Sequence, residues 1–333
     1  MRSPGSAFLT IISTINSQLT MTTLNRRQWL KLTGVAAIGL PFISHAAPDL
    51  RAKARKNLKL GIFTGVYASL PLEEAARRIA ADGFQSVVLE SGFADVHFDA
   101  WAPDWDKARQ IVRTLGNHNL KVAGLFAYYN VVDPDAAKRQ RGEKRMQVLM
   151  ENWKQLGSPI ISTETGTLNE KSEWAESPEN ATEQGYQACR AALEKLTQAA
   201  KKHGAIISIE AYWRNIIDSI DRTDRIMRDV PGLKLVMDPC NYYRKDELSR
   251  MDPMLEEMFR RLGKKIVLAH AKDVKASADG TDLPAAGRGV LDYPLYLRLL
   301  AGLNREIDLI VEHLTLDDVP RARDYVLSQF DKI

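Results

Sequence analysis

The chain has 333 residues, of which 45% are hydrophobic and 26% charged, a composition typical of a globular protein that buries a sizeable core. Its formal net charge is +4, but the first 47 residues carry four basic residues and no acid, so removing them takes 46 basic residues to 42, against 42 acidic. The near-neutral remainder argues against nucleic acid or an anionic membrane as a partner, because such partners require a dense basic surface.

The N-terminal segment has the features of an export signal. Residues 25–31, NRRQWLK, contain two adjacent arginines, and an apolar stretch at 32–43 precedes a small-residue cleavage site at 44–47. The apolar stretch is too short to span a bilayer comfortably. We therefore predict that residues 1–47 are an upstream extension and a twin-arginine signal peptide, with translation starting at Met1 or Met21. The twin-arginine export machinery would deliver the protein to the periplasm, with no membrane attachment after cleavage.

Residues 48–56 are expected to be a linker, and residues 57–333 alternate apolar runs with segments of helical period. The predicted strands are 58–63, 86–90, 121–126, 160–164, 205–210, 234–238, 265–270 and 308–312. The predicted helices are 71–81, 104–117, 136–156, 181–203, 217–229, 253–262, 294–303 and one from 318. Eight strand and helix pairs predict an α/β fold with a single (β/α)8 TIM barrel. A doubly wound sheet is disfavoured, because TGVY after the first strand is not a G-x-G-x-x-G turn.

The last four predicted strands end in side chains that can bind a metal. Glu210, Asp238, His270 and Glu312 close the fifth to the eighth strand. The carboxyl ends of barrel strands meet at one mouth, where active sites are built. Three carboxylates gathered there without a cation would repel one another. We therefore predict one divalent ion in a mostly oxygen site suited to Mn²⁺, Mg²⁺, Co²⁺ or Zn²⁺.

In their local sequences SIEAYW, MDPCNYY, HAKD and VEHL, and with the GRG turn at 287–289, these residues resemble the xylose-isomerase-like TIM barrels of the sugar phosphate isomerase and epimerase family. The resemblance runs from about Leu58 to the C-terminus. It implies that Glu210, Asp238, His270 and Glu312 hold one divalent metal, with Mn²⁺ favoured. It also implies that Glu210 and Glu312 act as acid and base on opposite faces of a sugar.

Further strand-end and loop residues are candidates for substrate binding. They are Asn241, Arg214, Arg288, Lys272, Asp273, Glu164, Tyr128 and Trp213. Asn241 stands where many epimerases of the family have a histidine, and an amide cannot shuttle a proton at neutral pH. Lys272 and Asp273 could instead form an ion pair behind the metal. His313 is expected to point away from the barrel interior, because neighbours on a strand alternate.

The sequence thus predicts a metal-dependent carbohydrate isomerase or epimerase that transfers a proton next to a carbonyl through an enediolate. Export favours an unphosphorylated substrate, a free or keto sugar or a cyclitol. The alternatives are a lyase, dehydratase or hydrolase acting on 3-keto-glycosides or related sugar derivatives, and a carbohydrate-binding barrel without turnover. A trinuclear zinc nuclease of related fold is disfavoured, because only His270 among the six histidines is expected at an inward strand end. The expected partner is a small-molecule carbohydrate, and a homo-oligomer is left open.

Overall fold

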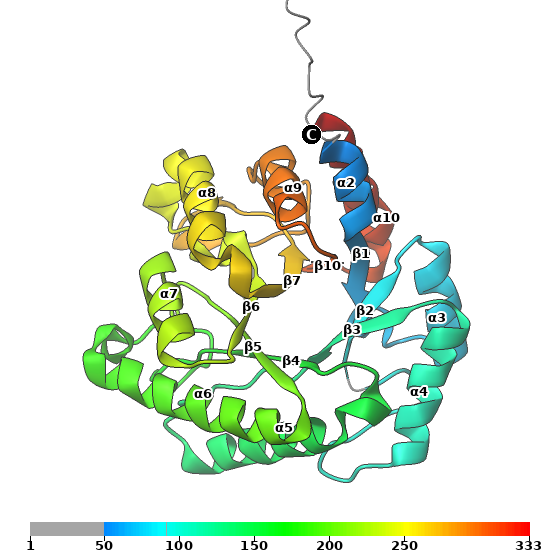
Figure 1. Ribbon diagram of the computed structural model, residues 1–333, viewed down its shortest axis with the longest axis horizontal. Coiled ribbons are helices and arrows are strands. Elements are labelled where there is room, and N and C mark those ends of the chain that lie inside the picture. Colours follow the sequence, from blue (N-terminus) through cyan, green and yellow to red (C-terminus); the bar gives the residue numbers. More distant parts are fainter. Residues whose placement is uncertain (1–49, 91) are drawn as a thin grey trace, which may run out of the picture. The chain divides into compact units, whose positions relative to one another are not determined.

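The computed structural model describes residues 50–90 and 92–333, and in this part of the chain eight parallel strands close into a barrel. They are β1 (Leu58–Phe63), β2 (Ser86–Leu89), β3 (Lys121–Phe126), β4 (Ile160–Glu164), β5 (Ile206–Glu210), β6 (Lys234–Met237), β7 (Ile266–Ala271) and β10 (Ile307–Val311). Around the barrel the order is β1, β10, β7, β6, β5, β4, β3, β2. β1 pairs in parallel with both β2 and β10, which closes the ring. The predicted (β/α)8 TIM barrel is confirmed (Figure 1).

Helices surround the barrel strands (Figure 1). They are α3 (Leu72–Ala81), α4 (Trp105–Asn117), α5 (Ala136–Leu156), α6 (Glu183–His203), α7 (Ile220–Asp229), α8 (Met251–Leu262), α9 (Tyr293–Gly302) and α10 (Val319–Gln329). The carboxylates of Asp104 and Asp135 accept backbone N–H groups at the starts of α4 and α5. Gly157 ends α5 with φ of 87°, a left-handed conformation that glycine adopts without strain. Local capping therefore sets helix ends close to those predicted from the sequence.

One further helix occupies most of the segment that was predicted to be a linker. α2 (Leu50–Asn57) packs against α9, and its Ala54 is fully buried. Arg55 forms an ion pair with Asp331 near the C-terminus, at 2.6 Å. This short helix was not predicted because its sequence is mostly basic and has too few apolar residues to show a helical period. The predicted export signal lies outside the described residues.

The loop after β7 contains a small antiparallel hairpin that the sequence analysis did not predict. β8 (Lys275–Ser277) pairs with β9 (Gly280–Asp282). Strands of this length carry too few residues for a visible alternation of apolar and polar side chains. The hairpin matters for the site because it leads directly into Leu283, which lines the cavity described below.

The apolar core has two parts. A large cluster fills the layer between strands and helices, and a small cluster of Val88, Ala123, Val236, Leu268 and Ile310 fills the barrel interior. Phe63 and Phe126, at the ends of β1 and β3, pack on the interior cluster. The barrel therefore has a solid apolar floor, and any cavity must lie above it at the carboxyl ends of the strands.

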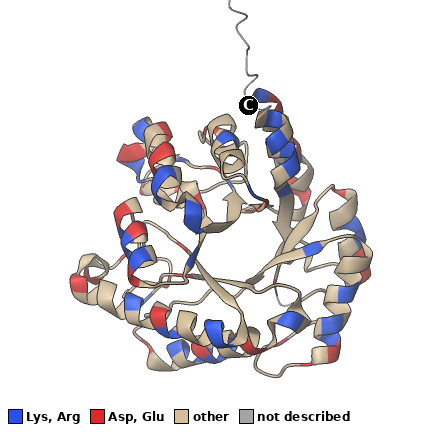
Figure 2. Cartoon of the chain, in the orientation of Figure 1, with Lys and Arg blue, Asp and Glu red and all other residues tan. Residues whose placement is uncertain are grey.

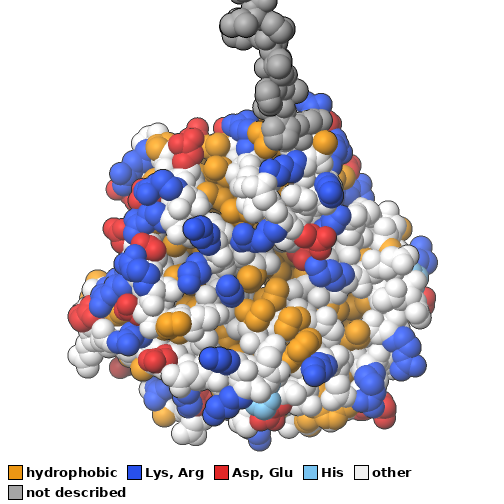
Figure 3. Space-filling view, in the orientation of Figure 1, with side chains coloured by type: hydrophobic (Ala, Val, Ile, Leu, Met, Phe, Trp, Pro, Cys, Tyr) orange, Lys and Arg blue, Asp and Glu red, His pale blue; other side chains and the backbone are white. Residues whose placement is uncertain are grey.

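Charged residues cover the helices, with both signs interspersed (Figure 2). The face shown in Figure 3 carries Lys and Arg among Asp and Glu at its rim, with hydrophobic side chains nearer the middle. Among the described residues, no helix combines the length and the apolar character needed to cross a membrane.

Candidate metal centre

The alternation of side chains along each strand directs the ligand candidates into the barrel. Leu268 and Ile310 belong to the interior cluster, and His270 and Glu312 follow each of them by two positions. Residues two apart on a strand face the same side, so His270 and Glu312 also point inward. Asp238 likewise follows Val236, the residue of β6 in the interior cluster, by two positions. The ligand candidates therefore lie directly above the apolar floor.

The structure brings the four predicted ligands together. Glu210, Asp238, His270 and Glu312 each offer one ligand atom, and these atoms all lie within 4.8 Å of one another. The Nδ1 atom of His270 is 3.2 Å from Glu210 Oε1, 3.3 Å from Glu312 Oε2 and 3.8 Å from Asp238 Oδ2. All four residues are buried. Nδ1 is therefore the imidazole atom that faces the carboxylates.

Lys272 contributes a second positive charge to this cluster. Its ammonium lies 2.6 Å from Asp238 Oδ2 and 2.8 Å from Glu312 Oε1, and the side chain is 3% exposed. Asp273 does not pair with it, although an ion pair between these neighbours was one expectation from the sequence. Successive residues face opposite sides here, so Lys272 reaches the cluster and Asp273 does not.

Burial and charge act in opposite directions on these groups. Burial alone would favour the neutral carboxyl of Glu210 and Glu312, but His270 and Lys272 hold the pKa of both well below the usual range. Burial raises the pKa of Asp238, and the other two carboxylates add to this shift against the opposing effect of Lys272. Burial would also lower the pKa of His270, but Glu312 and Glu210 raise it well above its ordinary value. The two internal cations thus favour the ionised form of Glu210 and Glu312, whereas the third carboxyl, Asp238, is shifted toward its neutral form.

The residues fit a divalent cation. Asp238 Oδ2 and Glu312 Oε1 are buried and form ion pairs with Lys272, but neither accepts a hydrogen bond from the residues that the structure describes. Buried carboxylate oxygens normally have a hydrogen-bond donor or a metal as partner. Three carboxylates and one imidazole form the hard donor set typical of Mn²⁺ or Mg²⁺. The cluster is therefore consistent with a bound divalent metal.

Two polar side chains orient Glu210 from other elements. Tyr128, after β3, donates its hydroxyl hydrogen to Glu210 Oε2. Asn241 lies in the short 3-10 helix η3 (Pro239–Tyr242) and donates from Nδ2 to Glu210 Oε1 at 2.6 Å. Both oxygens of Glu210 are thus fixed in direction, while Asn241 Oδ1 is buried with no hydrogen-bond partner. This arrangement holds the carboxylate in one orientation toward the barrel mouth.

A cavity of about 440 Å³ opens above the cluster. It is lined by Phe63, Phe126, Tyr128, Glu164, Trp174, Glu210, Tyr212, Asn241, Lys272, Leu283, Glu312 and His313. Its volume is in the range of small-molecule sites. Glu164, at the end of β4, pairs in register with Glu210 and is 3% exposed. Its Oε2 accepts a hydrogen bond from Asn215 Nδ2 at 3.1 Å, whereas Oε1 has no hydrogen-bond partner in the part of the chain that the structure describes.

The sequence of the chain matches the model of a known protein family. A family model described as xylose isomerase-like TIM barrel matches residues 74–327. The chain belongs to this family. The family consists mostly of metal-dependent sugar isomerases and epimerases, and one solved structure of similar fold is named for a probable dehydratase. A search of curated proteins finds no match to the chain.

Three solved structures illustrate the likeness. A xylose isomerase-like TIM barrel protein from Mycobacterium smegmatis, in complex with magnesium, is 15% identical, with 84% of this chain and 98% of that chain covered and a TM-score of 0.59. The 3-keto-D-glucoside 4-epimerase from E. coli is 15% identical, with 83% and 100% covered and a TM-score of 0.60. A probable 3-DHS dehydratase from Bacillus anthracis is 13% identical, with 82% and 97% covered and a TM-score of 0.62. At these identities the likeness establishes the fold.

Two residues that were expected to bind substrate have other partners in this barrel. Arg288 lies at the surface and donates to Asp318 at 2.6 Å. Asp273 accepts the backbone N–H groups of Val274, Gly287 and Leu291, each at 3.0 Å. Its carboxylate therefore holds the loop after β7 in place, and these contacts do not support the expected role in substrate binding.

Trp213 and Arg214 also differ from the expectation. The Arg214 guanidinium stacks on the Trp213 ring at 4.5 Å, and Arg244 approaches the same ring at 5.2 Å. Trp213 is thus enclosed by two cations rather than open to a sugar face. Tyr212, the residue before it, lines the cavity instead.

The prediction that His313 points away from the barrel interior is wrong. It lines the cavity, whereas strand alternation placed it away from the barrel interior. β10 ends at Val311, and His313 has φ of 57°, so alternation no longer applies at this position. Its Nδ1 lies 2.6 Å from the carbonyl oxygen of Leu283.

Besides Tyr212 and His313, four residues that line the cavity were not among the candidates from the sequence: Phe63, Phe126, Trp174 and Leu283. The first two end predicted strands, so their position in the chain was a usable signal. Trp174 and Leu283 come from long loops, where no periodicity indicates which side chain turns toward the mouth.

Proposed function

We propose that this chain is a divalent-metal-dependent isomerase or epimerase that acts on a free or keto sugar or on a cyclitol. The observation that carries the proposal is the placement of Glu210 and Glu312. Both line one cavity, and their strands, β5 and β10, are separated by β6 and β7 in the closed barrel. Two carboxylates can therefore reach a bound sugar from different sides.

The chemistry follows from these two bases. Against the effect of burial, His270 and Lys272 lower the pKa of both carboxyls in the metal-free cluster, so either of them can start the reaction as the base. One carboxylate, ionised, would remove the proton from the carbon next to the substrate carbonyl. The other, having first taken a proton from solvent, would return it to the enediolate from its own side. A divalent ion held by Glu210, Asp238, His270 and Glu312, with Mn²⁺ favoured, would polarise the carbonyl and stabilise the developing negative charge.

Other cavity residues support binding of a sugar. Tyr128 and Asn241 fix the direction of Glu210, so this base needs little reorganisation when it reacts. The ring of Phe126 stacks on Tyr128 at 4.6 Å, and Phe63 meets Phe126 edge-on at 6.0 Å. Such rings offer an apolar surface to the C–H face of a sugar.

Solvent isotope exchange tests the proposal. The protein, loaded with Mn²⁺, is incubated in D₂O with a panel of free and keto sugars, and deuterium at the carbon next to the carbonyl is measured by mass spectrometry. Glu210→Gln and Glu312→Gln should each lower exchange by about 10²–10⁴-fold, the usual contribution of a positioned base. Glu151→Gln, on an exposed part of α5, is the matched control. Unchanged exchange in both cavity variants would exclude this acid and base assignment.

A second candidate, a lyase or dehydratase, is favoured by Glu164. Burial raises the pKa of this carboxyl to about 8, so it carries a proton at neutral pH. Its unpartnered Oε1 lies in a residue that lines the cavity. Proton removal by Glu210 or Glu312, followed by protonation of a leaving hydroxyl or alkoxy group by Glu164, would complete an elimination. Product analysis separates the two reactions, because elimination yields an unsaturated product or a released aglycone.

The proposed periplasmic location rests on residues 25–31 and on the apolar stretch that follows them. Replacing Arg26 and Arg27 together with lysine should retain the protein in the cytoplasm, as measured by cell fractionation. The matched control is Arg55→Lys, a change of the same kind that lies beyond the predicted signal and is present with either start. Export of the double variant at the control level would contradict the twin-arginine assignment.

A further inference from the structure

A second cavity, of about 410 Å³, is lined by α4, α5 and the ends of β2 and β3. Buried side chains such as Leu89, Phe98, Ile111, Leu125 and Leu149 form its inner wall, and each is at most 7% exposed. Of the residues that line the metal cavity, only Phe126 also lines this one. The inner wall is therefore suited to an apolar group and cannot pair with the hydroxyl groups of a sugar.

Two arginines lie at the mouth of this cavity, beside an exposed tryptophan. Trp101 is 44% exposed, and two guanidinium groups from successive turns of α5 lie near its ring, Arg141 at 5.5 Å and Arg145 at 5.9 Å. Arg145 lines the cavity and donates to the carbonyl oxygen of Phe126 at 2.7 Å. Within residues 50–90 and 92–333, no carboxylate lies within ion-pair distance of either arginine. Burial lowers the pKa of Arg145, which shows that its charge is partly desolvated.

The two acidic residues among those that line this cavity, Glu90 and Asp99, keep their charge, and each accepts a backbone hydrogen bond. Glu90 accepts the backbone N–H of Gly65 at 2.5 Å, and Asp99 accepts the backbone N–H of Trp101 at 2.8 Å. Glu90 is near enough to stabilise the charge of Arg145 but forms no ion pair with it. Among the described residues, the Arg145 guanidinium has one hydrogen bond, to the carbonyl oxygen of Phe126, and no ion pair. It therefore retains donors for an anion.

From these observations we propose that the second cavity binds a small aromatic carboxylate. The ring enters the apolar chamber, and the carboxylate meets Arg145 at the mouth beside Trp101. A carboxylate matches the forked donors of a guanidinium, and a planar ring matches the aliphatic and aromatic wall. A neutral apolar ligand would leave the guanidinium without an anionic partner.

This ligand is distinct from the sugar of the proposed function, so the inference goes beyond that function. The two sites nevertheless share the side chain of Phe126, which stacks on Tyr128, and Tyr128 in turn donates to Glu210. An occupant of the second cavity therefore contacts the wall of the metal cavity without reaching the metal ligands.

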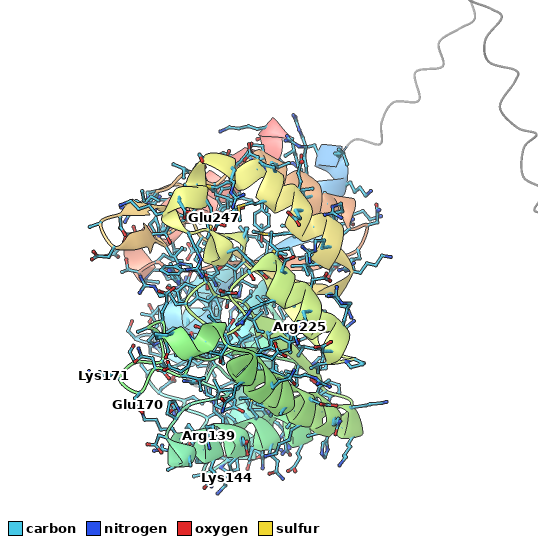
Figure 4. All side chains as sticks on the ribbon, turned by 90° about the vertical axis from the view of Figure 1, so that its left-hand side faces the viewer. Arg139, Lys144, Glu170, Lys171, Arg225 and Glu247 are labelled. Atoms are coloured by element: carbon cyan, nitrogen blue, oxygen red, sulfur yellow. The ribbon has the colours of Figure 1, made fainter. Side chains whose placement is uncertain are left out.

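Calorimetric titration of the full chain with 2-naphthoate tests the proposal without any turnover. We expect saturable binding with one site and a change in tryptophan fluorescence. Arg145→Met should weaken binding by at least about tenfold, the value of a charge-assisted hydrogen-bonded pair. Lys144→Met, which removes an exposed charge at the outer edge of α5, should change it by less than about twofold (Figure 4). Absence of saturable binding, or equal loss in both variants, would overturn the proposal.

Two further measurements identify the cavity. Ala108→Leu adds volume to a buried position of the wall and should weaken naphthoate binding even where Arg145 is intact. Its thermal unfolding curve shows whether the variant is folded. Glu210→Gln should bind naphthoate as the wild type does, whatever its isotope exchange. Loss of naphthoate binding in Glu210→Gln would place the ligand in the metal cavity and contradict the inference.

Discussion

The two halves of the barrel contribute different chemistry to the same mouth. One half carries the ionisable groups of the cluster, which lie within one residue of the ends of β5, β6, β7 and β10: Glu210, Asp238, His270 and Glu312. β1 and β3 end in Phe63 and Phe126, so the other half offers rings. The charged half can hold a metal and move protons, whereas the aromatic half can bind a sugar face. Variants in the charged half should therefore change metal affinity, whereas variants in the aromatic half should change KM for the sugar.

The largest effect is expected in the charged half. Asp238→Asn removes the charge of one predicted ligand and should lower the affinity for Mn²⁺ by at least about 100-fold, since loss of even an outer partner of a metal ligand can cost 10–100-fold. Competition with a chelator measures this affinity. Asp246→Asn, at an exposed position, is the control and should bind Mn²⁺ normally. Normal affinity in Asp238→Asn would exclude Asp238 from the ligand set.

Tyr128→Phe probes the contact between the two halves. It removes the hydrogen bond to Glu210 while keeping the ring that stacks on Phe126. We expect kcat for the proposed reaction to fall by about 10–100-fold, the value of a hydrogen bond to a charged group. Metal content should be unchanged, because Tyr128 is not among the predicted ligands. A fall in metal content equal to the fall in kcat would assign Tyr128 to metal binding instead.

Metal affinity should depend on pH. The neighbouring carboxylates raise the pKa of His270, so in the metal-free cluster its imidazole carries a proton at neutral pH. A metal can bind Nδ1 only after that proton leaves, so affinity should rise as pH rises below the raised pKa, by up to about tenfold per pH unit for each proton released. Calorimetry in buffers of different ionisation enthalpy measures the released protons. Affinity independent of pH between 6 and 8 would contradict a protonated His270.

The smallest effect is expected in the aromatic half. Trp174 lines the cavity yet is 51% exposed, so its ring can contribute only part of its surface to a bound sugar. Trp174→Ala should raise KM by about 2–10-fold, corresponding to a contact worth about 0.5–1.5 kcal/mol, with kcat nearly unchanged. A matched fall in kcat would show that the loop of Trp174 takes part in the chemical step.

Strand periodicity explains why so much of the charged half was predictable. A single run such as IVLAHA indicates a buried strand, and counting eight such runs assigns their ends to one barrel mouth. Side chains on a strand point alternately to its two faces, so every second residue points into the barrel. This alternation holds as long as the backbone remains extended. His270 and Glu312 satisfy that condition, and His313 does not, because its backbone has left the strand.

The sequence by itself determined the barrel and the four ligand candidates, because both depend on local patterns repeated in chain order. Only the tertiary structure decided how the surrounding residues are used. Asp273 holds backbone amides of its own loop, Arg288 pairs with a surface carboxylate, and Trp213 packs between two cations. Each of these outcomes depends on which loops meet in space, and such contacts between distant segments leave no periodic signal in the chain.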